Sequence, residues 1–63
     1  MAGDETSEVY FEFTVIGAVV KVAAIEATTG VEVSVMGPAS AAQSDLEQLA
    51  LAKLRARLAR ERD

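Results

Sequence analysis

The chain has 63 residues and a net charge of −4, with 51% apolar and 25% charged residues and neither cysteine nor histidine. This composition predicts one small folded domain, and it excludes disulfides, thiolate metal sites and the usual Cys–His or Ser–His catalytic pairs. A chain this short buries only about 60% of its unfolded surface, so we expect self-association to add stability. No apolar run approaches the roughly 20 residues that cross a bilayer, so we expect no membrane contact.

The first residues differ in composition from the rest of the chain. Residues 1–8 are small, polar and acidic, which predicts a flexible acidic leader before a single domain of residues 9–63. Asp4, Glu5 and Glu8 give this segment the wrong charge for a secretory signal. Together with the missing cysteines, the acidic start predicts a cytoplasmic protein.

Three segments have the pattern of β-strands. Val9 to Ile16 alternates apolar and polar residues, Val19 to Glu26 is nearly all apolar, and Val31 to Met36 alternates valines with other residues. Each segment ends in residues that favour turns, with Gly17 and Gly30 in the first two connections. These features predict three strands joined by short loops.

The two loops set the register of the predicted sheet. A two-residue type II′ turn at 17–18 would pair Phe13 with Val22, and a four-residue loop at 27–30 would pair Val22 with Val35. In both hairpins, core-facing residues then meet core-facing residues, and a slip by one would mix the faces. The expected sheet is an antiparallel meander in order 1-2-3.

A helix is expected after the third strand. The Gly37-Pro38 pair should end the strand, and the residues onward to about Glu61 are strong helix formers. The start stays open among Pro38 as the first helical residue and capping boxes that begin at Ser40 or Ser44. The predicted fold is therefore α+β: a three-stranded antiparallel meander with one C-terminal helix packed on one face, in the order β-β-β-α.

The predicted core combines one face of the sheet with one row of the helix. Its members are Phe11, Phe13, Val15, Val20, Val22, Val33, Val35, Leu46, Ala50 and Leu54. A helix from near Ala39 to Glu61 would overhang the sheet by about two turns. That overhang would leave Leu58 without an intramolecular contact.

Enzymatic activity is not expected. Glu12, Glu26 and Glu32 could serve as acids and bases, but we interpret them as charges on the solvent face of the sheet. The junction from Gly37 to Ser40 would present backbone N–H groups to an anion, yet no lysine or arginine lies nearby in sequence. We therefore expect no catalytic residue, cofactor or metal.

Basic residues gather at the end of the chain. Residues 49–63 contain five basic and two acidic residues, whereas residues 1–48 contain one basic and eight acidic. Lys53, Arg57 and Arg60 share one helix face and are a candidate contact for nucleic acid. A simpler explanation for these basic residues is their favourable interaction with the negative C-terminal end of the helix dipole. In addition, the acidic sheet would repel phosphates.

Two apolar surfaces are candidates for protein contact. The sheet face opposite the helix carries Tyr10, Val19, Ala23 and Ile25, and the end of the helix carries Leu51 and Leu58 about 20° apart. An ordinary exposed face with scattered apolar residues is the alternative for the sheet. We interpret the chain as a non-catalytic protein-interaction module, either a homodimer or the binder of a heterologous protein. The second hypothesis is a small nucleic-acid-associated protein that uses its basic helix.

Several runs occur in a characteristic order: Tyr10-Phe11-Glu12-Phe13, Val20-Lys21-Val22-Ala23-Ala24-Ile25, Thr29-Gly30-Val31-Glu32-Val33, Val35-Met36-Gly37-Pro38-Ala39 and Leu49-Ala50-Leu51-Ala52-Lys53-Leu54. Taken together they resemble a family of very short, uncharacterised bacterial proteins, over about residues 9–58. The resemblance implies a small bacterial protein without a known activity and brings no functional residues to this chain.

Overall fold

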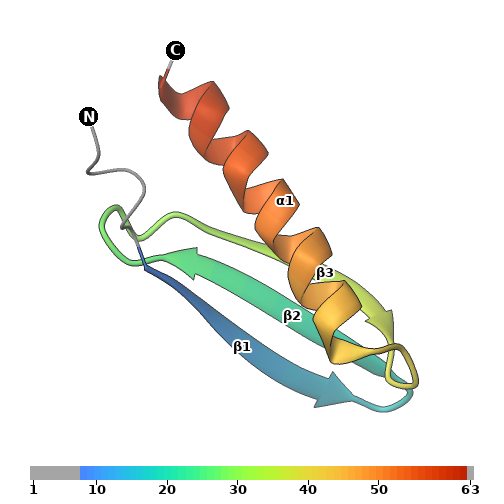
Figure 1. Ribbon diagram of the computed structural model, residues 1–63. Coiled ribbons are helices and arrows are strands. Elements are labelled where there is room, and N and C mark those ends of the chain that lie inside the picture. Colours follow the sequence, from blue (N-terminus) through green and yellow to red (C-terminus); the bar gives the residue numbers. More distant parts are fainter. Residues whose placement is uncertain (1–7, 63) are drawn as a thin grey trace.

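The computed structural model describes residues 8–62, which form one sheet and one helix (Figure 1). Its elements are β1 (Val9–Ile16), β2 (Val19–Glu26), β3 (Glu32–Pro38) and α1 (Gln43–Arg62). The strands form an antiparallel sheet in order β1-β2-β3, and α1 packs on β3 and β2. The predicted β-β-β-α fold is confirmed. The predicted acidic leader, residues 1–8, lies outside the described residues except for Glu8.

The first hairpin has the predicted register. Ile16 pairs with Val19, and Phe13 pairs with Val22. Gly17 has a φ of +60° and Ala18 does not have a positive φ, which are the signs of a type II′ turn. Because side chains alternate with period two along a strand, this turn decides which residues of β1 and β2 share a face.

The second hairpin also has the predicted register, but β3 extends further than expected. Val22 pairs with Val35, and the Glu26 N–H donates to the Val31 carbonyl oxygen at 2.9 Å. The strand includes Pro38, which was expected to lie beyond its end. The next ladder bond comes from Ala39, whose N–H donates to the Ala18 carbonyl oxygen at 2.8 Å. The nitrogen of Pro38 therefore points away from β2, where a missing N–H costs no ladder bond.

The helix begins at Gln43, so the predicted starts at Pro38, Ser40 and Ser44 are all wrong. The Ala41 N–H donates to the Pro38 carbonyl oxygen at 2.9 Å, which closes a tight turn before the helix. The Ala42 carbonyl oxygen then accepts hydrogen bonds from Asp45 and Leu46. Since the 37–40 junction precedes the helix by several residues, it does not offer the anion site of a helix N-terminus.

A close contact fixes the first turn of α1 on β3. A Cβ at Gly37 would lie 2.7 Å from Leu46 Cδ2, and Leu46 is buried. A side chain at position 37 would therefore require the Leu46 side chain to shift from its present position. No helix among residues 8–62 combines the length and apolar character that a membrane span requires.

The core lies between α1 and the β2–β3 part of the sheet. Its buried members are Val20, Val22, Ala24, Val33, Leu46, Ala50 and Leu54. Phe11, Phe13 and Val35 are only half-buried against it. Val15 is 69% exposed, so its assignment to the core is wrong. The strand period had placed Val15 on the correct face, but α1 does not cover that part of β1.

Two leucines of α1 offer a matched test of this packing. Leu54 is fully buried, whereas Leu49 is 59% exposed on the same helix. We expect Leu54→Ala to lower the free energy of unfolding by about 2–5 kcal/mol, because it opens a cavity in the core. Leu49→Ala should change it by no more than about 0.5 kcal/mol. Urea denaturation followed by circular dichroism measures both, and equal losses would contradict this core.

Candidate functional site

The helix lies to one side of the sheet. The Lys53 Nζ donates to the Ser34 carbonyl oxygen at 2.8 Å, which places that side of α1 over the outer edge of β3. Figure 1 shows α1 running over β3 and β2, with β1 as the strand away from the helix. The helix-facing side of β1 is therefore only partly covered, and least of all at Val15.

The partly covered apolar side chains on this side of β1 form a surface that we call the β1 shelf: Phe11, Phe13 and Val15. Both phenylalanines are half-buried, and Val15 is mostly exposed. Next to the shelf stand Leu51 and Leu58 of α1, which lie about 140–160° around the helix from Lys53 at 100° per residue. Both leucines are half-buried. The shelf and these two leucines therefore lie on the same side of the molecule, the β1 side.

Leu58 itself does not match its prediction. It packs against the core instead of standing beyond the sheet. The reason is the start of the helix at Gln43, four residues later than Ala39, which removes about 6 Å from the expected length at 1.5 Å per residue. Leu58 therefore contributes a half-exposed flank to the shelf and not a free helix end.

The two outer edges of the sheet differ. On β3, Lys53 occupies the outward-facing Ser34 carbonyl, and Pro38 offers no N–H. Both features are known ways of blocking an edge strand against a further strand. Among the described residues, no hydrogen bond from a side chain reaches the outward-facing backbone of β1. A partner strand can therefore pair with β1 but meets obstacles at β3.

The sheet face opposite the helix is less continuous than the sequence indicated. Tyr10 and Val19 are exposed there, and Ile25 is half-buried. Ala23 is only 2% exposed, because its small side chain lies between Glu12 and Ser34 of the neighbouring strands. Ala23 is therefore wrong as a contact residue, and the charged side chains of this face interrupt its apolar surface.

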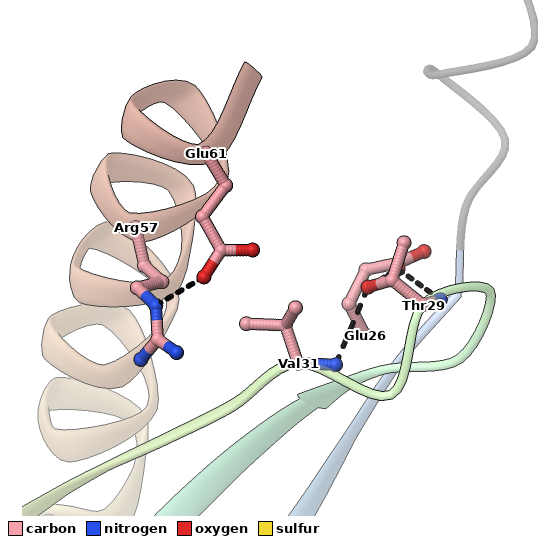
Figure 2. Close-up of polar contacts among 5 residues, drawn as sticks. All are labelled: Glu26, Thr29, Val31, Arg57 and Glu61. Atoms are coloured by element: carbon pink, nitrogen blue, oxygen red, sulfur yellow. Dashed lines mark hydrogen bonds and ion pairs between the residues drawn. The ribbon is translucent and has the colours of Figure 1, made fainter. Parts of the chain in front are cut away.

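The three candidate basic residues do lie on one side of α1, but two of them already have partners. Lys53 holds the Ser34 carbonyl, and Arg57 Nε pairs with Glu61 Oε2 at 2.7 Å (Figure 2). Arg60 is exposed. This arrangement leaves a weaker cationic surface than the sequence indicated.

Glu26 is a buried carboxylate that the sequence had placed on the solvent face. It is 4% exposed and holds the β2–β3 loop together (Figure 2). Its Oε1 accepts from the Thr29 hydroxyl at 2.6 Å and from the Thr29 N–H at 2.8 Å, and its Oε2 accepts from the Thr28 N–H at 3.1 Å. Its position in strand period was the available signal, because Glu26 shares the parity of Val22 and Ala24.

These hydrogen bonds change the acidity of Glu26. The Thr29 hydroxyl and the Thr29 N–H, and to a smaller extent Thr28, hold the carboxylate in its charged form and lower its pKa to about 2. Burial acts in the opposite direction but is the weaker effect. Both carboxylate oxygens of Glu26 accept hydrogen bonds from its own loop, which is a structural role, whereas Glu12 and Glu32 are exposed as expected.

The acidic side chains of the described residues are spread over the sheet and the helix and do not form a cluster. Glu12 lies on β1 and Glu32 on β3, with β2 between them, so the strands are about 9.6 Å apart at 4.8 Å per spacing. Within residues 8–62 no three acidic side chains gather as metal ligands would. The most distinctive surface of the described chain is the β1 shelf with its neighbouring free edge.

The fold and this surface define a small β-β-β-α domain with one uncovered edge strand. Residues 6–61 match the model of a family described as Domain of unknown function (DUF6898), and the chain belongs to that family. No curated protein and no solved structure matches the chain. The expectation of a small family without a known activity is confirmed, and the family description assigns no functional residues.

The low pKa of Glu26 makes a testable contribution to stability. The carboxyl has an ordinary pKa of 4.5 in the unfolded chain and about 2 in the folded one. The stability it adds is therefore fully present above pH 4.5 and is lost as the pH falls from there through about 2. We expect Glu26→Gln to destabilise the fold at pH 7, by an amount that shrinks between pH 5 and pH 3.

The control for this prediction is Glu32→Gln, which removes the same charge from an exposed position. It should change the free energy of unfolding little at any of these pH values. Thermal unfolding at pH 7, 5 and 3 compares the two variants with the wild type. A loss in Glu26→Gln that stays constant with pH would contradict the assignment.

Proposed function

We propose that the chain is a non-catalytic protein-interaction module that binds its partner through the β1 shelf and the free edge of β1. The 69% exposure of Val15, beside two half-buried phenylalanines on the helix-facing side, carries the proposal. An apolar surface beside an unblocked strand edge suits an extended partner strand. In such pairing, main-chain hydrogen bonds give affinity and alternate side chains give specificity.

The residue types of the chain support a non-catalytic role. The full sequence contains neither cysteine nor histidine, the residues that most often act as nucleophile or base. The buried carboxylate of Glu26 accepts three hydrogen bonds from its own loop. Catalysis at this site would need groups that the β1 shelf does not carry.

Nucleic-acid binding by the basic helix is the less supported alternative. Lys53 and Arg57 already bind Ser34 and Glu61, and Glu61 adds a negative charge beside the arginine. A phosphate backbone would also meet the acidic half of the chain. For the compartment we propose the cytoplasm, which suits a chain without cysteine. A bacterial source remains an expectation of the resemblance.

The proposal predicts that one charge on the shelf abolishes partner binding. Val15→Glu places a carboxylate on the shelf, and Met36→Glu places the same charge at an exposed position of the opposite edge strand. With tagged baits, the wild type and Met36→Glu should retain a partner that Val15→Glu loses, whether that partner is another protein or the untagged chain. Circular dichroism checks that both variants fold. Equal retention by all three baits would contradict a role for the shelf.

A second prediction distinguishes the protein-interaction module from the nucleic-acid-binding alternative. We expect no sub-micromolar binding to duplex or single-stranded nucleic acid near the physiological salt of about 0.15 M. Fluorescence anisotropy over a salt series measures it. Sub-micromolar binding that disappears in the double variant Arg57→Ala, Arg60→Ala would overturn the proposal in favour of a nucleic-acid-associated protein.

A further inference from the structure

We infer that the partner of β1 is a second copy of this chain, joined by antiparallel β1–β1 pairing with Phe13 of both copies at the two-fold axis. This inference rests on the proposed function and specifies its partner and register. The result is a six-stranded sheet with β1 of each copy at the centre and both helices on the same face.

The hydrogen bonds of the first hairpin decide which backbone groups face the free edge. The Ala27 N–H donates to the Glu8 carbonyl oxygen at 2.9 Å, and Glu8 has the same parity as Tyr10, Glu12 and Thr14. Those residues therefore direct their N–H and C=O groups toward β2. The residues between them direct theirs outward: Val9, Phe11, Phe13 and Val15.

When two such edges pair, outward-facing residues must lie opposite outward-facing residues. Near the middle of β1 this condition allows three registers, with the two-fold axis at Glu12, Phe13 or Thr14. A two-fold axis at Glu12 would set the carboxylates of the two copies directly opposite each other, and like charges in that position are destabilising. An axis at Thr14 would set Glu12 opposite the apolar Ile16 and shorten the paired segment. An axis at Phe13 avoids both faults.

The register with Phe13 at the axis pairs chemically matched residues throughout. Phe11 lies opposite Val15 of the second copy, and Glu12 lies opposite Thr14. Tyr10 lies opposite Ile16, and both of these side chains are 54% exposed in the single chain. Val15, the most exposed large apolar residue described, also gains a neighbour. Each exposed apolar side chain of β1 is therefore matched by one of the second copy.

This symmetry favours a second copy over an unrelated strand. On either side of Phe13, β1 has the same order of residue types. First comes a charged or hydroxyl residue, then an apolar residue on the core-facing side, and then a large side chain on the opposite face: Glu12, Phe11 and Tyr10 in one direction, and Thr14, Val15 and Ile16 in the other. A strand with that pattern is complementary to itself when turned antiparallel. The obstructed edge of β3 then disfavours growth beyond two copies, because Lys53 occupies the outward-facing Ser34 carbonyl and Pro38 lacks an N–H.

Cysteine cross-linking reads the register directly, since the chain has no cysteine of its own. Glu12 and Thr14 of different copies form a non-hydrogen-bonded pair with Cα atoms about 4.5 Å apart, within disulfide range. Purified Glu12→Cys and Thr14→Cys proteins are mixed and oxidised mildly. We expect the mixed disulfide as the main product, with little dimer from Glu12→Cys alone. Met36→Cys, on the open face of β3, is the background control.

Solution mass completes the experiment. Sedimentation of the wild type from about 10 µM to 1 mM should show a dimer that Val15→Glu loses and Met36→Glu keeps. Efficient dimers of Glu12→Cys alone would overturn the register. A monomer at 1 mM with cross-linking at the Met36→Cys background would overturn the inference. The proposed function would still stand if a bait then retained another protein in a Val15-dependent way, and it would fail if no bait did.

Discussion

One helix is too narrow to cover three strands, and most features of this domain follow from that limit. An α-helix with its side chains is about 10 Å across, and strands lie about 4.8 Å apart, so one helix covers two strands. Here α1 covers β3 and β2. The fully buried core is consequently aliphatic, and the two phenylalanines of β1 lie at its margin. The fully buried side chains thus lie in the β2–β3 half, while β1 joins the fold by pairing with β2 and by the partly buried Phe11 and Phe13.

The same placement explains why the two edges of the sheet differ. Because α1 lies over β3, Lys53 can reach the Ser34 carbonyl and cover that edge. Among the described side chains of α1, none makes such a hydrogen bond to the backbone of β1. An eight-residue strand with unblocked backbone groups and apolar side chains normally carries a risk of aggregation. The partner that we propose would remove that risk, and Glu12 in the centre of β1 limits the registers that can form.

The sequence predicted the strands, both turns and the register because these depend on local pattern. Gly17 allows one turn type, and the period-two alternation of β1 and β2 tolerates no slip. The errors at Val15 and at the helix start concern properties that no local pattern contains. Alternation gives the face of Val15 but not whether the helix covers it. Similarly, several residues before Gln43 could cap a helix, and the turn closed by the Ala41 N–H and the Pro38 carbonyl oxygen moves the start past Ser40.

For the candidate site, the sequence named the flanking residues Leu51 and Leu58 but assigned the shelf to the core. Phe11, Phe13 and Val15 have the composition of buried residues, and only the lateral position of α1 makes them available. Glu26 shows the opposite error, since a charged residue was taken as exposed although its loop supplies three donors. Burial in so small a domain depends on a few tertiary contacts more than on residue type.

The geometry of the inferred dimer also limits its affinity. With two β1 strands at the centre, the helices lie about four strand spacings apart, or about 19 Å at 4.8 Å each. Packed helices need a separation of 8–10 Å, so the two helices do not touch. The association must then come from main-chain hydrogen bonds and from the pairs along β1. Backbone hydrogen bonds contribute modestly when they replace bonds to water, and an interface of one strand is small. A dimer of this kind is therefore weak and concentration-dependent, with the phenylalanines of both copies still partly accessible between the helices.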